Sequence, residues 1–116
     1  MYKMFKNHNI EVCRGDSFTI NFPINLGSPI FPEYYTLQEN DSVYFGLMEP
    51  NQDFEDALIR KMYTSNNQND SIISMSFEPT DTEELLPGKY YYSIKLQKAN
   101  GEVYTLIPKT SFVIFD

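Results

Sequence analysis

The sequence has 116 residues and a formal net charge of −7 at pH 7, a length that fits one domain spanning residues 1–116. Its single cysteine and single histidine exclude an internal disulfide and a four-ligand zinc site of the usual kind. No apolar run reaches the roughly 18 residues of a membrane-spanning helix, and the acidic balance argues against direct nucleic-acid binding.

Hydrophobic residues make up 41% of the chain and aromatic residues 16%, and glycine, proline and asparagine recur at short intervals. This combination predicts a folded chain of short strands joined by turns. A first strand is expected over residues 9–14. The clearest strand covers 17–26, where every second residue from Phe18 onward is apolar. Residues 27–40 predict a loop that could cover one end of the core with Ile30, Phe31, Tyr34, Tyr35 and Leu37.

The middle of the chain predicts three further strands. Residues 42–49 alternate between apolar and polar. Residues 57–64 carry apolar side chains at both odd and even positions, which fits a strand and also a single helix over 53–63. The strand is favoured, because the run is short and a polar loop follows it at 65–70. Residues 71–78 alternate again.

The last third predicts a hairpin and a closing strand. Residues 89–98 alternate cleanly, and Asn100-Gly101 is typical of a two-residue type I′ turn. Two strands follow, over 102–107 and 110–115, separated by a proline. Most of these seven or eight strands have one apolar face, so we expect an all-β fold in which two antiparallel sheets pack face to face as a β-sandwich.

A short corner precedes the hairpin. Thr80 and Glu83 have the spacing of a capping box for one helical turn. Pro87 and Gly88 then end the turn, and Tyr90 stands near the start of the next strand. In immunoglobulin-like sandwiches a tyrosine at this place donates its hydroxyl to an upstream backbone group. The segment therefore predicts a structural corner formed by Pro87, Gly88 and Tyr90, and an immunoglobulin-like sandwich.

Five segments in order carry a family resemblance. A Gly-Asp turn opens the first long strand, a Val-Tyr-Phe strand follows the first loop, and a Leu-Pro-Gly-Lys-Tyr corner precedes the hairpin. The segments are residues 14–20, 41–45, 56–61, 86–92 and 101–106. They resemble the immunoglobulin-like domain of prophage tail and baseplate-associated proteins of Gram-positive bacteria, and are similar to the N-terminal domain of baseplate upper proteins.

The resemblance implies a virion or prophage accessory protein that catalyses nothing, needs no cofactor and binds other phage tail proteins or itself. It also implies a location in the bacterial cytoplasm during assembly, or in the virion. The start of the chain has no apolar stretch of signal-peptide length, which favours the same compartment. Two alternatives remain open. One is a small acidic phage inhibitor of a host nucleic-acid enzyme, and the other is a carbohydrate-binding sandwich module.

The residues offer few chemical groups for catalysis. His8 and Cys13 would face opposite sides of a continuous strand, so no catalytic pair is expected. The acidic clusters at 53–56 and 81–84 lack the spacing of a calcium loop, so no metal site is expected either.

Exposed tyrosines are the remaining candidates for function. Tyr44, Tyr91 and Tyr104 are assigned to outward positions of three strands. Tyrosine is enriched in protein–protein interfaces. We therefore expect these three residues to form a protein-contact surface if their strands are neighbours.

Overall fold

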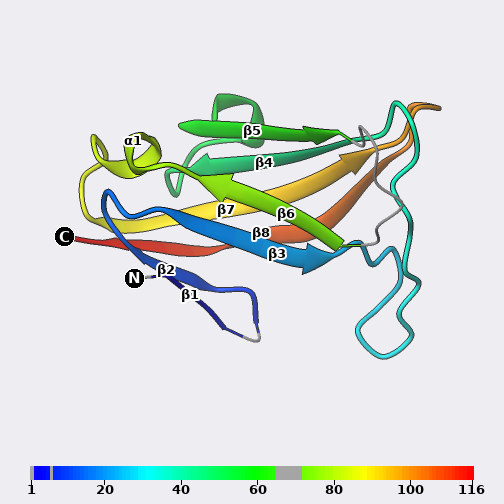
Figure 1. Cartoon of the computed structure of the whole chain (residues 1–116), viewed down its shortest axis with the longest axis horizontal. Helices are drawn as coiled ribbons and strands as arrows, with labels where there is room; N and C mark the ends of the chain where they lie inside the picture. The colour runs from blue at the N-terminus through cyan, green and yellow to red at the C-terminus, as the bar shows by residue number, and fades with distance from the viewer. Residues whose placement is uncertain (1, 6, 65–71) are drawn as a thin grey trace.

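The computed structural model describes residues 2–5, 7–64 and 72–116, which form an all-β structure (Figure 1). Its elements are β1 (Tyr2–Met4), β2 (Ile10–Cys13), β3 (Phe18–Pro23), β4 (Ser42–Met48), the 3₁₀ turn η1 (Phe54–Asp56), β5 (Ile59–Thr64), β6 (Ile72–Phe77), the one-turn helix α1 (Pro79–Thr82), β7 (Gly88–Gln97) and β8 (Val103–Phe115). No helix in this described part is long and apolar enough to cross a membrane. The loop expected at 65–70 lies outside the described residues.

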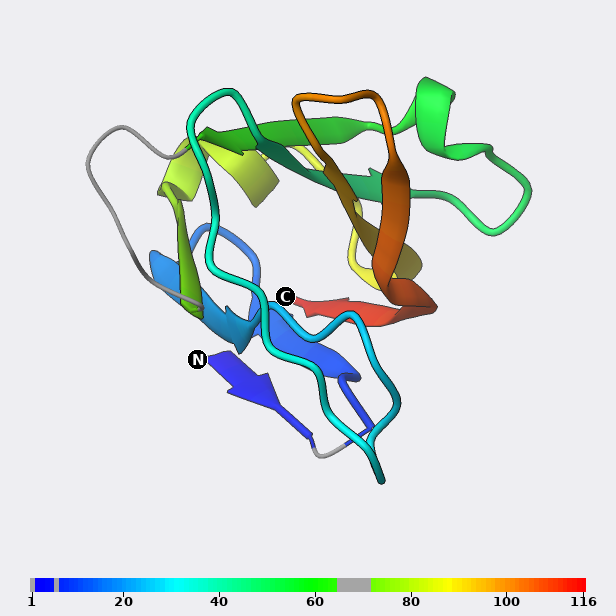
Figure 2. The ribbon, with the colours of Figure 1, turned by 90° about the vertical axis from the view of Figure 1, so that its right-hand side faces the viewer.

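The strands form two sheets of unequal size. Six strands pair in the order β1-β2-β8-β7-β4-β5, while β3 and β6 pair with each other. The large sheet is curled, and the two-stranded sheet lies across its concave side (Figure 1, Figure 2). The expectation of purely antiparallel sheets was wrong at one place, because β2 runs parallel to β8. The chain passes through all five strands from β3 to β7 between β2 and β8, and a parallel pair requires such a long connection.

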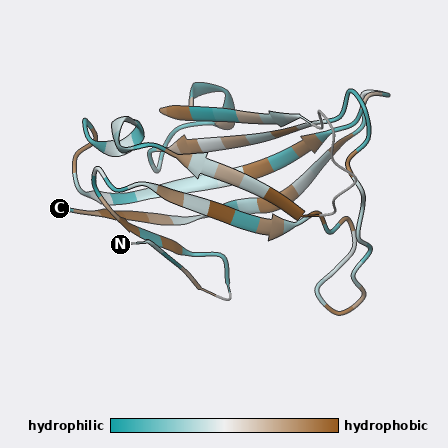
Figure 3. Ribbon diagram, in the orientation of Figure 1, coloured by the Kyte–Doolittle hydropathy of each residue, from teal (hydrophilic) through white to brown (hydrophobic). Residues whose placement is uncertain are grey.

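Period-two alternation places the small sheet on the core. Phe18, Ile20 and Phe22 of β3 are buried and the residues between them are exposed, as predicted. β6 has the same pattern, and Figure 3 shows the alternation along both strands. Apart from Ile72 and Pro23 at one end, the exposed face of this sheet is polar, with the hydroxyl groups of Thr19 and Ser76 3.3 Å apart across the strands.

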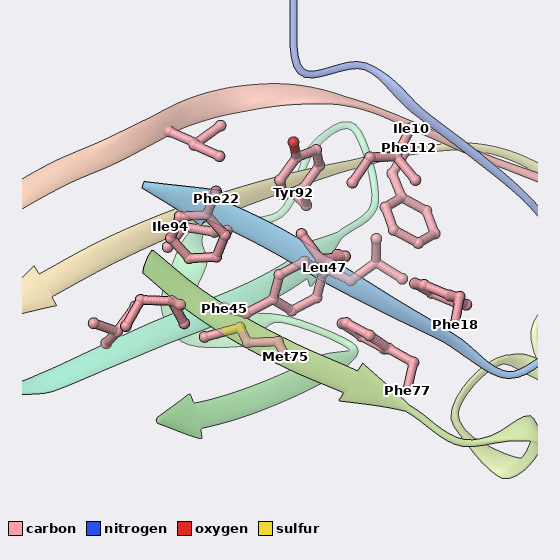
Figure 4. Close-up of a cluster of buried hydrophobic side chains, with 14 of the residues drawn as sticks. Ile10, Phe18, Phe22, Phe45, Leu47, Met75, Phe77, Tyr92, Ile94 and Phe112 are labelled. Carbon is pink, nitrogen blue, oxygen red and sulfur yellow. The ribbon is translucent and has the colours of Figure 1, made fainter. Parts of the chain in front are cut away.

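Aromatic rings fill the space between the two sheets (Figure 4). The Phe77 ring stacks on Phe18 at 4.6 Å between centroids and meets Phe45 edge-on at 5.0 Å. Phe45 also stacks on Tyr92 at 5.6 Å, and Tyr92 meets Phe112 edge-on at 5.9 Å. Edge-on and stacked pairs of this kind stabilise a core beyond their buried area. Here they join β3 and β6 to β4, β7 and β8.

Strand boundaries differ from the prediction at both ends of the chain. The three-residue strand β1, which pairs with β2, was not predicted. The expected strands 102–107 and 110–115 are one strand, β8, whose pairing with β7 is irregular around residue 93. Ser93 lies opposite Gly46 on the outer face of the large sheet, and its buried hydroxyl donates to the Ile107 carbonyl at 2.8 Å. The strand expected over 57–64 is confirmed as β5.

Two local turns also differ. Lys98 N–H donates to Glu102 O at 2.8 Å, so the β7–β8 turn has three residues, 99–101, between this pair. Gly101 N–H donates to Lys98 O at 2.9 Å, and Gly101 alone in this turn has a positive φ, of 94°. This is a type I turn followed by a glycine bulge and not the expected type I′ turn. Helix α1 begins two residues earlier than the Thr80–Glu83 pattern implies, because Glu78 is the N-cap and the Asp81 carboxylate accepts its N–H at 2.7 Å.

The corner before β7 holds its tyrosine by the hydroxyl. Tyr90 is buried, and its hydroxyl donates to the Leu86 carbonyl at 2.6 Å. Pro87 and Gly88 are exposed between these partners, and Gly88 begins β7. The hydrogen bond therefore ties the start of β7 to the turn that leads from α1.

Replacing Tyr90 with Phe removes this bond and leaves the ring in place. We expect Tyr90→Phe to lower the free energy of unfolding by about 1 kcal/mol, the usual net value of such a bond. Urea denaturation measures this change. The matched control is Tyr91→Phe, which makes the same chemical change at a half-buried neighbouring position. Equal effects from the two variants would contradict this role of the Tyr90 hydroxyl.

Candidate protein-binding loop

The segment between β3 and β4 extends away from both sheets (Figure 1, Figure 2). Hydrophobic colour marks its far end in Figure 3. Ile30 is 81% exposed and Phe31 80% exposed, the highest values among the large hydrophobic residues described. Residues 25–34 are called the tip loop below. Two adjacent large apolar side chains in water are unfavourable for a free protein, so they point to a contact surface.

Hydrogen bonds fix the backbone of the tip loop. The Asn25 side-chain oxygen accepts the N–H groups of Gly27 and Glu33, both at 2.9 Å. Ser28 N–H donates to Phe31 O at 3.2 Å, and Phe31 N–H donates back to the Ser28 hydroxyl at 3.0 Å. An isolated β-bridge between Asn25 and Tyr34 closes the loop. The side chains at 30 and 31 therefore stand on a closed, hydrogen-bonded turn.

Gly27 is needed for this close turn. A Cβ atom placed there would lie 2.4 Å from the Phe31 carbonyl oxygen and 2.9 Å from the Glu33 nitrogen. Both neighbours are backbone atoms and cannot rotate away. Any other residue at position 27 must open the loop.

Both ends of the longer segment are anchored in the core. Ile24 and Leu37 are buried on either side of the tip loop. Further along, Asp41 is buried, and its carboxylate accepts the Tyr35 hydroxyl and the Ala99 N–H, the latter at 2.9 Å. The Asp41 side chain thus joins the end of the segment to the β7–β8 turn.

These bonds shift the pKa of both partners. Burial acts to raise the pKa of the Asp41 carboxyl, but hydrogen bonds from Tyr35, Gln38 and Ala99, with the charge of Lys98, outweigh it and lower that pKa. The pKa of Tyr35 is raised to about 12 by burial and by its bond to the Asp41 carboxylate. Asp41 therefore stays ionised at neutral pH and holds its donors.

A groove of about 410 Å³ lies beside the tip loop. Residues of β3, β8 and the loop line it, among them Phe22, Pro29, Thr105 and Leu106. Its lining includes His8, which is counted as neutral at pH 7, and none of its residues is Asp, Glu, Lys or Arg. An uncharged groove therefore continues directly into the exposed apolar pair.

The three tyrosines expected to form one surface are separated. Tyr44 lies opposite Lys95 on the outer face of the large sheet, and Tyr91, four positions before Lys95 in β7, lies opposite Met48. Tyr104 lies opposite Leu96 and packs partly against the core. The pairing irregularity between residues 94 and 95 of β7 changes which face Tyr104 occupies, and this reverses its predicted outward position.

The ring of Phe54, which was not predicted to lie on the sheet, occupies the outer face between Tyr44 and Tyr91. Phe54 of η1 lies over Gly46 of β4, where a Cβ atom would be 2.8 Å from the ring. The Lys95 ammonium lies 4.9 Å from its centroid and the Arg60 guanidinium 5.9 Å. Cations over an aromatic face are attracted to it. This part of the outer face is therefore covered by the protein itself.

The two side chains weighed as a catalytic pair, His8 and Cys13, lie on different parts of the chain, and His8 also lines the groove beside the tip loop. His8 is in the turn between β1 and β2, and Cys13 is half-buried at the end of β2. Among residues 2–5, 7–64 and 72–116, no group of three or more His, Cys, Asp or Glu side chains could hold a metal ion.

Sequence reasoning misplaced the tip loop side chains. Five apolar or aromatic residues of 27–40 were expected to cover the core, and two of them, Tyr35 and Leu37, do pack against it. Ile30, Phe31 and Tyr34 do not, since they are the exposed residues of the loop. The available signal was the flanking of Ile30-Phe31 by two prolines, which favours a stiff turn over a core strand.

Comparison of the sequence with protein-family models gave no match, and comparison with curated proteins gave none either.

Substituting Gly27 tests the closed turn. We expect Gly27→Ala to open the loop, so that the amide protons of Leu26 and Ser28, which donate to Glu33 O and Phe31 O, exchange with solvent faster. NMR-detected hydrogen exchange measures both amides, with the amides of β7 as the internal reference. Unchanged exchange at the two loop amides would show that the turn does not depend on Gly27.

Acid titration tests the Asp41 anchor. Asp41→Asn should lower the free energy of unfolding at pH 7 by about 1–3 kcal/mol, the cost of poorly satisfied buried groups. Because folding lowers the pKa of Asp41, its ionised carboxylate stabilises the native protein above a pH of about 3.9, the pKa of this group in the unfolded chain. This stabilisation is lost as the pH falls through the lower pKa of the folded protein. The difference between wild type and variant should therefore narrow in acid.

Urea denaturation at a series of pH values measures that difference. Glu39→Gln, which neutralises an exposed carboxylate two residues away, is the control. A difference that stays constant down to pH 2 would contradict the assignment.

Proposed function

We propose that this chain is a protein-binding module that contacts its partner through the tip loop and acts by binding rather than by catalysis. The observation that carries the proposal is the pair Ile30 and Phe31, exposed at 81% and 80% on a turn closed by hydrogen bonds. A fixed loop loses little conformational freedom on binding, so its apolar area contributes more fully to affinity.

The charge of the loop favours a protein partner over a membrane. Residues 24–40 contain two glutamates and no Lys or Arg. Peripheral membrane-binding segments use cations to approach anionic lipid headgroups. A partner protein with an apolar pocket suits this loop better, because it needs no positive charge on the tip.

We further propose that the fold is an immunoglobulin-like sandwich of the kind found in prophage tail and baseplate-associated proteins. The small sheet over the concave face of the large one supports this, as does the hydroxyl bond of Tyr90 at the corner. In this role the chain would bind another tail component during assembly in the bacterial cytoplasm or in the virion.

Photo-crosslinking from the tip tests the proposal. Phe31 is replaced by the photoreactive residue benzoylphenylalanine, the variant is produced in the native cell and irradiated, and crosslinked products are identified by mass spectrometry. We expect one dominant protein product, either a tail structural protein or this chain itself. Met62, which is also exposed but lies on β5, receives the same residue as the control position.

Each other outcome has a defined meaning. A dominant product with a host nucleic-acid enzyme would replace the tail role by the inhibitor alternative. Equal products from positions 31 and 62, or none from 31, would contradict the tip loop as the contact surface.

A further inference from the structure

We propose that the partner of the tip loop is a second copy of this chain, in a twofold dimer where each tip enters the groove of the other copy. This inference rests on the proposed function, since it names the partner of the same surface. It follows from the placement of an apolar projection directly beside an apolar groove on one molecule.

The projection and the groove are continuous in the chain. Pro29 lines the groove, and Ile30 and Phe31 follow it directly. The other walls come from the end of β3 and from residues 104–108 of β8. In a twofold dimer the same patch occurs on both partners and must fit itself. An adjacent projection and groove satisfy this condition, because a single twofold rotation places the tip of each copy in the groove of the other.

The distribution of acidic residues supports a second copy of the chain as the partner at this surface. The chain carries 16 acidic residues and a net charge of −7, so most faces of two copies would repel each other. The groove lining and residues 28–32 contain no acidic side chain. Two copies can therefore meet here with an uncharged contact at its centre and Glu33 beyond it.

Sedimentation equilibrium of the full chain, from low micromolar to submillimolar concentration, tests the dimer. We expect a concentration-dependent monomer–dimer equilibrium. Phe31→Asp removes the projection and should weaken association by about 100-fold or more, as loss of a central apolar anchor does. The matched control is Met62→Asp, which places the same charge on a similarly exposed position of β5 and should leave association unchanged.

A second variant blocks the groove and leaves the tip intact. Thr105 is exposed and lines the groove, so Thr105→Trp should fill it without disturbing the core, and circular dichroism checks the fold. Thr105→Trp alone should be monomeric. Mixed with Phe31→Asp it should form a one-to-one heterodimer that is weaker than the wild-type dimer and stronger than either variant alone, because the intact tip of Thr105→Trp fits the open groove of Phe31→Asp and one of the two contacts is kept.

The outcomes separate this inference from the proposed function. A wild-type chain that stays monomeric over the whole range overturns the dimer, and a position-31 crosslink to another protein would then leave the protein-binding role standing. A wild-type dimer that Phe31→Asp does not weaken, or variants that fail to complement each other, also overturns it. Absence of both self-association and crosslinks overturns both proposals.

Discussion

Side-chain packing between two separate sheets is the constraint on which the rest of the structure depends. β3 and β6 pair with each other and belong to a different sheet from the remaining strands, so aromatic contacts hold them in place. The ring of Phe77 provides the clearest link, since it stacks on Phe18 within the small sheet and meets Phe45 of the large one. Lys61 of β5 extends this link, with its ammonium 4.8 Å from the Phe77 ring and 2.9 Å from the Asp81 carboxylate. Because the end of β3 is fixed in this way, the segment that follows it leaves the core at a fixed place.

That fixed departure explains how a small domain can present hydrophobic side chains in an ordered form. Ile24 and Leu37 anchor the segment on both sides, and the side chain of Asn25 replaces strand pairing within it. Exposing Ile30 and Phe31 costs stability and solubility in the free chain, and the net charge of −7 opposes unspecific association. The arrangement favours one specific contact, because the two most exposed large apolar side chains stand together on one ordered loop beside a groove.

The sequence predicted what depends on local periodicity and could not predict what depends on pairing. Alternation correctly assigned the buried residues of β3 and β6, and the shortness of its apolar run correctly favoured a strand for β5. Tyr104 was assigned to the wrong face, because an irregularity in the β7–β8 pairing shifts the alternation and nothing in the sequence marks its position. Phe54 was not recognised as a surface cover, since that role depends on the absence of a side chain at Gly46 on a distant strand. Ile30 and Phe31 were assigned to the core because apolar residues usually belong there. The turn that exposes them is closed by hydrogen bonds that Gly27 and Glu33 donate to the Asn25 side chain.

Backbone ¹⁵N relaxation of the tip loop tests the central claim most directly, namely that the exposed apolar pair is held in one conformation before any partner binds. The closed turn predicts order parameters near the rigid value of about 0.85 found in well-ordered backbone for the non-proline residues of 26–33. Values below about 0.6 in these residues, with high values in β7 and β8, would show a flexible loop and would contradict a preformed contact surface.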